Sequence, residues 1–435
     1  MRYKILCICV LLFMLTGCTL VRPDSSTTVV YLDDSSKEEN KKNQTEKRIQ
    51  DIEPLVEYQE PEHHHVQLLA VGDIMVHRWQ LEGAYNAESG LYDFSHSFEY
   101  IAPYIKKSDY AIANLETTLA GKKRGYQGYP RFNTPEILAK NLKDAGFDMV
   151  TTANNHSMDS NAEGVLHTIN ILEEVGLDYV GTYKSQEDSE QIFIKEINNI
   201  SFAFLSYTYG TNGIPVPMDQ SYLVNTWNMY EENRLEEMYQ KVREAKKLNP
   251  DFVVIAVHFG NEYHSFPNVH QENIVDQLFQ AGADIILGNH AHVLQPIQVR
   301  QITKEDGTKK KGIVIYSLGN FISSQKPTKE DPAPKDAGVI FGLDIEKIEG
   351  DSAIINNILL IPTWVQWIRK NNKPFHRVIA VEQALRDAEE GQTNFSNVEL
   401  QTMKRVKDQT LKHLMYYLEE DIEVEDDIYY IRLQN

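Results

Sequence analysis

The sequence predicts an α/β protein built from two packed β-sheets with helices on their outer faces, and two observations carry this prediction. From Val66 to about residue 293, short apolar runs typical of buried strands alternate with segments of helical spacing. After residue 295 the pattern changes to successive strands around a charged turn, TKEDGTKKK. A four-layer αββα sandwich accommodates this order, because each sheet can bury one face against the other sheet and its second face against helices.

The alternating region supplies most of the predicted elements. Gly146 and Gly176 follow two helical segments and are expected to end them. Residues 193–210 are expected to form a hairpin that turns at Asn198 and Asn199, because asparagine favours tight turns. The expected strands are 66–73, 110–116, 147–156, 177–182, 251–260 and 283–293, and the expected helices are 135–146, 161–175, 234–249 and 271–282.

Beyond residue 295 the chain is rich in strands and ends in a helical and acidic tail. In the tail, residues 380–435, apolar residues recur at helical spacing between Leu400 and Leu418. We expect this helix to pack on the preceding domain, residues 63–379, and the acidic stretch 419–427 to form a solvated surface. The expected strands are 296–302, 312–321, 337–346 and 353–366.

The N-terminus has the pattern of a secretory signal. Arg2 and Lys4 precede an apolar run, residues 5–15, that is too short to span a membrane comfortably as a finished helix. The next residues, LTGC, resemble a bacterial lipobox, which implies that residues 1–17 are removed as a signal peptide and that the Cys18 thiol is lipidated. The alternative is an uncleaved signal anchor. In both cases we expect the bulk of the chain outside the cytoplasmic membrane, and lipidation would hold it on the extracytoplasmic face of the cell membrane.

A polar segment separates the lipobox from the first strand. Residues 18–62 lack the apolar content that would offset the entropy cost of ordering, so we expect a flexible tether after the lipidated cysteine. The histidine run at 63–65 lies just before the first strand. An exposed run at a domain edge is expected to be incidental rather than a metal site.

The chain is strongly acidic and poor in cysteine. It contains 43 Lys+Arg and 63 Asp+Glu, a formal net charge of −20, which argues against nucleic acid as a partner and against attraction to anionic lipid. An anionic substrate would therefore need a cationic group in its site. The three cysteines are Cys7, Cys9 and Cys18, so the body of the mature chain would have no disulfide and no cysteine nucleophile or thiolate ligand.

Side chains able to bind metal ions directly follow five of the predicted strands. Sites in open α/β sheets form at the carboxyl ends of strands, so these side chains are expected to meet in one crevice. His290 and His292 are two residues apart, and in an extended chain this spacing points both to one side. Each residue alone has an ordinary alternative, such as a helix cap or a turn residue. The group comprises Asp73, Glu116, Asn155 with His156, His258, and His290 with His292.

Six short motifs, which lie roughly between Val66 and Phe321, resemble those of the bacterial capsule synthesis protein CapA family in sequence and in order along the chain. The family is implicated in making or exporting poly-γ-glutamate, its members are anchored to the membrane outside the cell, and its fold is similar to that of calcineurin-like metallophosphoesterases. The resemblance implies a metal-dependent hydrolase site, and mixed nitrogen and oxygen ligands suit one or two divalent ions of Mn, Zn or Fe. The motifs are GDIM (72–75), NLE (114–116), ANNH (153–156), HFGNEY (258–263), GNHAHV (288–293) and SLGNF (317–321).

The resemblance also implies a role for each residue. Asp73 corresponds to the first metal-binding aspartate, and Glu116 stands where phosphoesterases have a metal-bridging aspartate. Asn155 corresponds to the amide ligand. His156 corresponds to the histidine that assists the leaving group without binding metal, and Glu262 is a candidate base or a partner of a ligand. The remaining imidazole ligands correspond to His258, His290 and His292.

The sequence departs from the phosphoesterase pattern in three places. Phosphoesterases have Asp-x-His after the first strand, but here residue 75 is Met75 and the nearest histidine is His77. The bridging residue is glutamate rather than aspartate. The acidic residue expected after the Asn-His pair is replaced by Ser157, with Asp159 further on. With these departures we still expect a metal site, but occupancy by two ions and ordinary phosphodiesterase activity are in doubt. Asn320, in the SLGNF motif, is expected to have a structural role.

Two classes of function remain open. The first is a metal-dependent hydrolase, in which the cation offsets the acidic body of the protein. The second is a non-catalytic or weakly catalytic accessory protein that holds the growing polyanion poly-γ-glutamate or docks on membrane synthase subunits. A solute-binding lipoprotein would need two similar lobes and a hinge, and the sequence indicates neither.

Overall fold

The computed structural model describes residues 60–227, 232–303, 307, 309–370 and 372–433 of the 435-residue chain. The predicted signal peptide, Cys18 and the predicted tether up to residue 59 lie outside the described residues. The described residues from Pro61 onward form one compact unit. Across the described ranges, no helix combines the length and the apolar character needed to cross a membrane.

Within the described residues, the larger sheet has ten strands and is organised around β1 (His63–Ile74). β1 pairs in parallel with β4 (Tyr110–Leu115) and antiparallel with β14 (Ala337–Ile348). The order is β17-β18-β15-β14-β1-β4-β5-β6, with β13 beside β1 and β16 beside β15. The other strands are β5 (Met149–Thr151), β6 (Asp178–Val180), β13 (Asn320–Ile322), β15 (Ile354–Lys370), β16 (Lys373–Ala380), β17 (Ile422–Glu425) and β18 (Ile428–Arg432).

The smaller sheet has the order β11-β12-β10-β9-β8-β7. Its four central strands are parallel, and both edge strands are antiparallel to their neighbours. Asn198 and Asn199, with φ of 47° and 62°, form the predicted hairpin turn between β7 and β8. The strands are β7 (Phe193–Ile197), β8 (Ile200–Thr208), β9 (Phe252–His258), β10 (Ile285–Asn289), β11 (Leu294–Thr303) and β12 (Lys309–Leu318).

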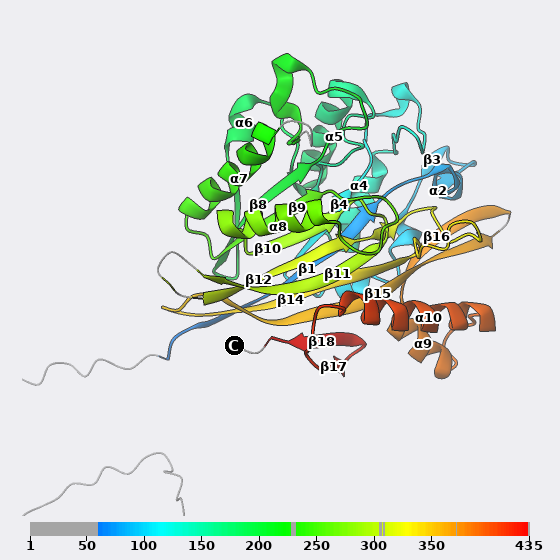
Figure 1. Cartoon of the computed structure of the whole chain (residues 1–435). Coiled ribbons are helices and arrows are strands. Elements are labelled where there is room, and N and C mark those ends of the chain that lie inside the picture. Colours follow the sequence, from blue (N-terminus) through cyan, green and yellow to red (C-terminus); the bar gives the residue numbers. More distant parts are fainter. Residues whose placement is uncertain (1–59, 228–231, 304–306, 308, 371, 434–435) are drawn as a thin grey trace, which may run out of the picture. The chain divides into compact units, whose positions relative to one another are not determined.

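The two sheets face each other across the main hydrophobic core, and helices cover their outer faces (Figure 1). On β1, Val66, Leu68 and Ala70 point into the core between the sheets, whereas Leu69 and Val71 face the helical side. This is the alternation that a strand requires. Helices α4 (Ile137–Ala145) and α5 (Asn161–Val175) pack on the larger sheet, and α7 (Glu232–Lys247) and α8 (Val269–Ala281) pack on the smaller one. The predicted four-layer αββα sandwich is therefore confirmed.

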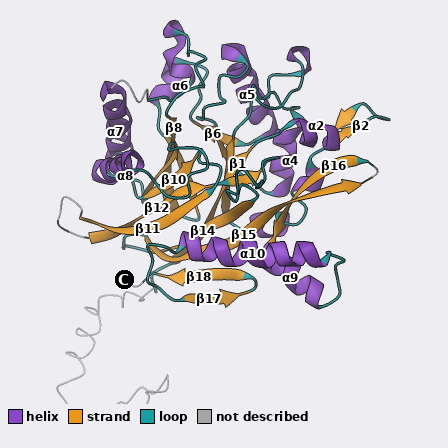
Figure 2. Ribbon diagram, turned by 45° about the vertical axis from the view of Figure 1, so that its right-hand side comes forward, coloured by secondary structure: helices purple, strands orange, loops and turns teal. Residues whose placement is uncertain are grey.

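The long helices lie where the sequence pattern predicted them, and Figure 2 shows the helices in purple. α4 (Ile137–Ala145) and α5 (Asn161–Val175) end at Gly146 and Gly176, which adopt the left-handed conformation that favours glycine. The short helices α2, α3 and α6 and a small hairpin were not predicted, because so few residues carry little periodicity. The remaining elements are α2 (Arg78–Ala84), α3 (Ala102–Ile105), α6 (Gln186–Glu190), α7 (Glu232–Lys247), α8 (Val269–Ala281), α9 (Val381–Glu389), α10 (Asn397–Leu414), β2 (Tyr85–Asn86) and β3 (Leu91–Tyr92).

The helix predicted in the C-terminal tail packs on the preceding domain as expected. α10 contacts β15 and β11, and Leu414 at its end joins the core between the sheets. β18 then extends the larger sheet beside β15. The acidic stretch 419–427 is mostly exposed, but Ile422–Glu425 also forms the edge strand β17, which the expectation of a solvated surface did not include.

Candidate metal centre

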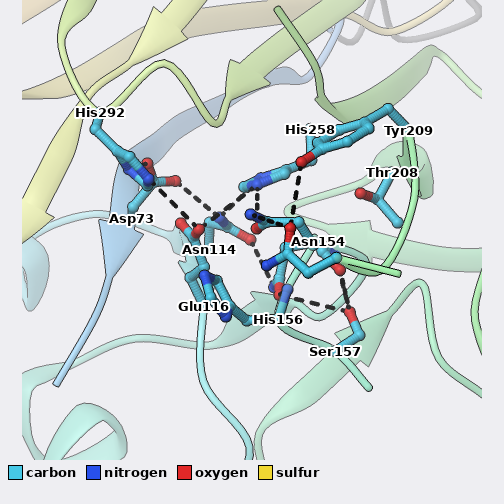
Figure 3. A network of polar contacts seen from close by, with 12 residues as sticks. Asp73, Asn114, Glu116, Asn154, His156, Ser157, Thr208, Tyr209, His258 and His292 are labelled. Carbon is cyan, nitrogen blue, oxygen red and sulfur yellow. Dashed lines mark hydrogen bonds and ion pairs between the residues drawn. The ribbon is translucent and has the colours of Figure 1, made fainter. Parts of the chain in front are cut away.

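The predicted metal ligands meet at the carboxyl ends of strands from both sheets. Figure 3 shows Asp73, Glu116, His258 and His292 among them. Asp73 lies near the end of β1, Glu116 follows β4, and Asn155 follows β5 in the larger sheet. All of the predicted ligands are buried. The smaller sheet supplies the imidazoles, His258 at the end of β9 and His290 and His292 after β10.

Glu116 is the least satisfied carboxylate of this group. Its side chain is fully buried, and neither carboxylate oxygen has a hydrogen-bond partner among the described residues. Its Oε1 lies 3.6 Å from His258 Nε2 and 3.9 Å from His292 Nε2. Burial, followed by the nearby charge of Asp73, raises the pKa of Glu116 well above its usual value. Because an unpaired buried carboxylate is costly, this arrangement fits a binding site for a cation.

Asp73 is held from two sides and by its backbone. Asn114 Nδ2 donates a hydrogen bond to Asp73 Oδ1 at 2.8 Å, and His292 Nδ1 lies 3.0 Å from Oδ2. The backbone N–H of Asp73 donates to Gly319 O at 2.9 Å. A Cβ on Gly72 would lie 1.9 Å from the same oxygen, so only glycine permits this close approach. The GDIM and SLGNF motifs therefore meet directly behind the ligands.

His258 and His290 provide neutral imidazoles on the other side of Glu116. His258 Nε2 lies 2.9 Å from Asn155 Oδ1, and the His258 and His290 ring centroids are 4.8 Å apart. Burial, followed by repulsion from neighbouring imidazoles, lowers the pKa of His258 well below its usual value and that of His290 to about 3. Both rings are thus uncharged near neutral pH, the form in which histidine binds metal ions.

The GNHAHV loop brings its two histidines together by a different backbone path from the predicted one. An extended chain was expected, but β10 ends at Asn289, and His290 and His292 have φ of 93° and 56°. The ring centroids are nevertheless 6.0 Å apart. The expected meeting of the rings is confirmed, whereas the extended conformation is wrong. Left-handed φ values in residues other than glycine are uncommon and cluster at functional sites.

Two sets of three ionisable residues place ligand atoms within 4.8 Å of one another. The second set includes Glu262, predicted as a base or a partner of a ligand, so its exposed carboxylate also reaches a ligand position. Buried acidic and imidazole groups of this kind can hold a metal ion, as the sequence predicted. The sets are Asp73, Glu116 and His258, and Glu262, His290 and His292.

His156 has a carboxylate partner that the sequence pattern places two residues later than usual. His156 Nδ1 lies 2.7 Å from Asp159 Oδ2, and both side chains are nearly fully buried. Asp159 also accepts a hydrogen bond from the backbone N–H of Phe132 at 2.6 Å. Ser157 instead donates to Thr152 O and closes the local turn. Asp159 therefore takes the place of the acidic residue that is missing directly after the Asn-His pair.

His77 does not replace the histidine that is missing at position 75. Met75 is 1% exposed and apolar. His77 Nδ1 accepts a hydrogen bond from the backbone N–H of Ser324 at 3.3 Å, and its ring packs edge-on against Phe132. Neither Met75 nor His77 belongs to the two ligand sets found among the described residues. β1 therefore contributes one ligand, Asp73, where phosphoesterases have two.

Three polar residues that support the ligands were not predicted. Asn114 fixes the aspartate at the end of β1, and Asn154 Nδ2 donates to Leu115 O at 2.8 Å, which ties the ANNH loop to β4. The Tyr209 ring lies 4.7 Å from the His290 ring. Both asparagines stand inside quoted motifs, so the motifs carried a signal for them, whereas nothing in the local sequence marked Tyr209.

Asn320 has the structural role that was expected. Its side-chain amide donates to His292 O at 3.1 Å and to Lys335 O at 3.0 Å. These bonds tie the segment after β13 to the histidine loop. Asn320 is buried and acts on the backbone of the ligand loop rather than on a ligand atom.

The fold and the site define an αββα protein with a candidate metal centre of carboxylates and imidazoles at the rim of its sheets. The resemblance seen in the sequence motifs implied this metallophosphoesterase-like architecture. The chain belongs to the family described as bacterial capsule synthesis protein PGA_cap, whose model matches residues 67–325.

Two relatives and one solved structure illustrate the similarity. The chain is 32% identical over 286 residues to capsule biosynthesis protein CapA of Bacillus anthracis, covering 65% of each chain. It is 31% identical over 274 residues to PGA biosynthesis protein CapA of Bacillus subtilis (strain 168), covering 60% of this chain and 63% of that one. The matches thus span slightly less than two thirds of these relatives. The crystal structure of TT1561 of Thermus thermophilus aligns with 9% identity and a TM-score of 0.33, over 63% of this chain and 93% of that one.

Proposed function

We propose that this chain acts in the synthesis or export of a poly-γ-glutamate capsule and that its metal centre is a hydrolase site of the phosphoesterase type. One observation carries the hydrolase proposal: Glu116 is fully buried beside imidazoles, and neither carboxylate oxygen has a hydrogen-bond partner among the described residues. Family membership and two relatives named for capsule or PGA biosynthesis support the capsule role.

The donor set fits one or two divalent ions of Mn, Zn or Fe, because it mixes carboxylate and amide oxygens with neutral imidazole nitrogens. A bound ion supplies a Lewis acid for an anionic oxygen and a water of lowered pKa. Positive charge at this position also makes the acidic chain compatible with an anionic substrate. The proposed ligands are Asp73, Glu116, Asn155, His258, His290 and His292.

His156 is the residue proposed to move a proton. Asp159 engages its Nδ1 at 2.7 Å, so Nε2 is the ring nitrogen left to serve a leaving group. Asp159 also fixes the orientation of the ring, as a carboxylate commonly does for a working histidine. Glu262 is the second proposed proton carrier, because its exposed carboxylate lies beside His290 and His292 at the open side of the centre.

The residue at position 75 favours a second candidate function. Met75 is buried and offers no nitrogen ligand, so the site has one ligand fewer than the phosphoesterase pattern. Weaker metal binding and low activity would suit an accessory protein. Such a protein would hold the growing polyanion or dock on membrane synthase subunits without cleaving the polymer.

We also propose that a lipid on Cys18 anchors the chain to the extracytoplasmic face of the cell membrane. The support is the LTGC sequence after a short apolar run. In cells fed labelled palmitate, the wild-type chain should become labelled and the Cys18→Ala chain should not. The variant should also be released or remain an unprocessed precursor. Equal labelling of both chains would rule out this anchor.

Metal content gives the first test of the proposed centre. The full chain, purified without chelator, should contain about one to two equivalents of Mn, Zn or Fe, as expected for a metal-assisted hydrolase. The His290→Ala/His292→Ala double variant should lose most of it. A matched control is the His167→Ala/His413→Ala double variant, because these two histidines contact backbone carbonyls away from the ligand sets. A wild-type chain that carries no metal and binds none at micromolar concentration would exclude the hydrolase and leave the accessory function.

Hydrolysis gives the second test. The metal-loaded full chain should cleave bis(p-nitrophenyl) phosphate or shorten poly-γ-glutamate. His156→Gln should lower kcat about a hundredfold or more without loss of metal, because it removes the proton carrier and spares the ligands. His167→Gln should leave kcat unchanged. Full metal occupancy with no cleavage of either compound would favour the accessory function instead.

A further inference from the structure

A basic loop, residues 121–131, lies beside the candidate metal centre in an otherwise acidic chain. The segment 117–135, which contains this loop, has no aspartate or glutamate, although 63 of the 435 residues of the chain are acidic. The chain thus concentrates positive charge on one segment while its net charge is −20. The loop carries four exposed cationic residues, Lys122, Lys123, Arg124 and Arg131.

One buried side chain holds the basic loop in place. Asn133 is 2% exposed, and its Nδ2 donates to Gly121 O at 3.1 Å and to Gly125 O at 2.8 Å. Its Oδ1 accepts a hydrogen bond from Ala120 N at 2.8 Å. Gly121 and Gly125 have φ of 88° and 78°, a conformation that favours glycine. Because both ends of the short 3₁₀ helix Lys122–Arg124 are bonded to one buried amide, its lysines are displayed at a defined place.

The other end of the basic loop is joined to the candidate metal centre. Arg131 Nε donates to Asp159 O at 2.9 Å, and the backbone N–H of Phe132 donates to Asp159 Oδ2 at 2.6 Å. The Phe132 ring packs edge-on against the His156 ring, with centroids 4.6 Å apart. His156 is the residue proposed above to move a proton. The loop therefore carries exposed positive charge from the neighbourhood of this histidine to its own lysines.

Two carboxylates near the basic loop already have partners within it. Glu163 forms an ion pair with Arg124, and Glu136 accepts a hydrogen bond from the Tyr126 hydroxyl at 2.5 Å. The charge of Arg124 is thus used within the protein, and we assign it no part in binding.

The other three cations of the loop have no carboxylate partner in the part of the chain that the structure describes. Lys122 and Lys123 make neither a hydrogen bond nor an ion pair there. Arg131 donates only to uncharged oxygens, Asp159 O and Asn161 Oδ1. Three positive charges on one exposed loop are therefore available to a bound anion.

We propose that the basic loop is the docking surface for a polycarboxylate chain, with Lys122, Lys123 and Arg131 as the partners of its carboxylates. A polymer with a free carboxylate on every residue offers repeated negative charge to cations that lie apart on the surface, and such complementarity favours binding. A polymer held along the loop would pass beside the candidate metal centre at the Arg131 end. This inference rests on the proposed function, because the polymer is the poly-γ-glutamate of that proposal. It adds that residues other than metal ligands hold the polymer.

Polymer binding without turnover tests the docking surface. The purified full chain, freed of metal with a chelator, would be titrated into fluorescein-labelled poly-γ-glutamate, and fluorescence anisotropy would give the dissociation constant at several salt concentrations. Wild type should bind the polymer more weakly as salt rises and should not bind the same polymer after its carboxylates are amidated. The triple variant Lys122→Gln/Lys123→Gln/Arg131→Gln should bind about tenfold more weakly, because each exposed charge contact contributes about a factor of two to three.

A second triple variant controls for the overall charge of the chain. It lowers the net charge by the same amount at exposed lysines of α7 and α10, which lie outside the basic loop. Its affinity for the polymer should stay within about twofold of wild type, because salt screens distant charges. Equal weakening by the two triple variants would overturn the docking surface. The control is Lys247→Gln/Lys404→Gln/Lys412→Gln.

A double variant separates polymer binding from the local structure around Asp159. Lys122→Gln/Lys123→Gln leaves Arg131 bonded to Asp159 O, so the surroundings of His156 are unchanged. It should still weaken polymer binding about fivefold. If the double variant binds as tightly as wild type, the loss in the triple variant comes from a disturbed Asp159 and the docking surface is wrong.

A second polyanion tests the chemistry of the partner. Single-stranded DNA that carries the same number of charges should compete poorly with the labelled polymer. If this DNA displaces poly-γ-glutamate from the loop at equal concentration, the loop recognises polyanions in general, and its assignment to a polycarboxylate is wrong.

Failure of the docking surface can be told apart from failure of the hydrolase, because the binding test uses the metal-free chain. A chain that holds the polymer through the basic loop but cleaves nothing would keep the docking surface and support the accessory function. A chain that hydrolyses bis(p-nitrophenyl) phosphate but binds the polymer equally well with and without the loop cations would keep the hydrolase and exclude the docking surface.

Discussion

A buried carboxylate lies near each end of strand β10, and the two carboxylates have opposite surroundings. At its start, Asp284 is 1% exposed, accepts a hydrogen bond from Val253 N at 2.8 Å, and forms ion pairs with Lys246 and Lys310. At its far end, Glu116 from the neighbouring sheet lies close to His292 and has no hydrogen-bond partner among the described residues. One buried carboxylate is thus paired with lysines of the chain, whereas the other lies beside imidazoles and the like-charged Asp73.

This difference separates a stabilising carboxylate from one that is kept for a ligand. A buried ion pair is costly to break, because removal of one partner leaves the other charge unpaired at depth. Glu116 has no hydrogen-bond partner among the described residues and lies near the like charge of Asp73, so its ionised form would gain stability from the proposed metal ion. We therefore expect the candidate metal centre to lower the stability of the protein without the proposed ion, and the left-handed backbone at His290 and His292 adds to this cost.

The largest expected effect on stability and metal affinity comes from replacing each of the two carboxylates by its amide. Asp284→Asn should lower the free energy of unfolding by about 3 kcal/mol, because Lys246 and Lys310 lose their buried counter-charge. Glu116→Gln should leave the metal-free chain as stable as wild type or more so, yet lower its metal affinity about a hundredfold or more. Urea unfolding after chelation and metal titration measure the two quantities. Equal destabilisation by both variants would contradict the contrast between the two ends.

A buried histidine away from the ligands should make stability depend on pH. His376 Nε2 lies 3.0 Å from Ser324 Oγ, and burial, followed by repulsion from His77, lowers the His376 pKa to about 3. Below pH 6.5 the unfolded chain takes up a proton at this residue while the folded chain does not, so stability falls as the pH is lowered. Between pH 7 and pH 5 this residue should account for about 2 kcal/mol of the loss.

The comparison of wild type with His376→Gln isolates this term. The variant should lose about 2 kcal/mol less than wild type between the two pH values in urea unfolding. Other buried histidines, including His77, remain in both chains and cancel in the difference. Identical pH dependence in the two chains would show that His376 takes up its proton over the same pH range in the folded and the unfolded chain.

Most of the candidate metal centre could be predicted because its proposed ligands directly follow apolar runs. Each apolar run indicates where a strand ends, and parallel strands bring their carboxyl ends to one rim of the sheet. The meeting of Asp73, Glu116 and His258 could therefore be predicted without knowledge of tertiary contacts. The backbone path of GNHAHV could not be predicted in the same way. Its left-handed residues depend on contacts such as Tyr263 N to Ala291 O, which join distant parts of the chain.

The residues that support the ligands were harder to predict for a related reason. Asn114 lies within a buried strand, where its side chain carries no periodic signal. Tyr209 and Asn212 lie on the long excursion after β8, which has no regular period and is positioned by the distant bridge between Thr208 and Thr226. Local patterns therefore predict which side chains reach the rim, while long-range pairing decides which neighbours orient them.

The smallest expected effect tests one of those orienting neighbours. Asn212 Oδ1 accepts from Asn155 Nδ2 at 3.3 Å, which leaves Asn155 Oδ1 turned toward His258 Nε2 at 2.9 Å. Asn212→Ala should weaken metal binding up to about tenfold, because the amide of Asn155 can then rotate and present its nitrogen. The exposed position of Asn212 predicts no change in the unfolding midpoint of the metal-free chain.

A matched variant makes that result specific. Asn212→Asp keeps an oxygen acceptor for Asn155 and should retain more metal affinity than Asn212→Ala in the same titration. If both variants bind metal as tightly as wild type, the orientation of Asn155 is set by His258 alone. If both weaken it equally, the loss comes from the loop and not from the acceptor. Asn212 is identified as the residue that directs the Asn155 oxygen toward the candidate metal centre only if metal affinity decreases from wild type to Asn212→Asp to Asn212→Ala.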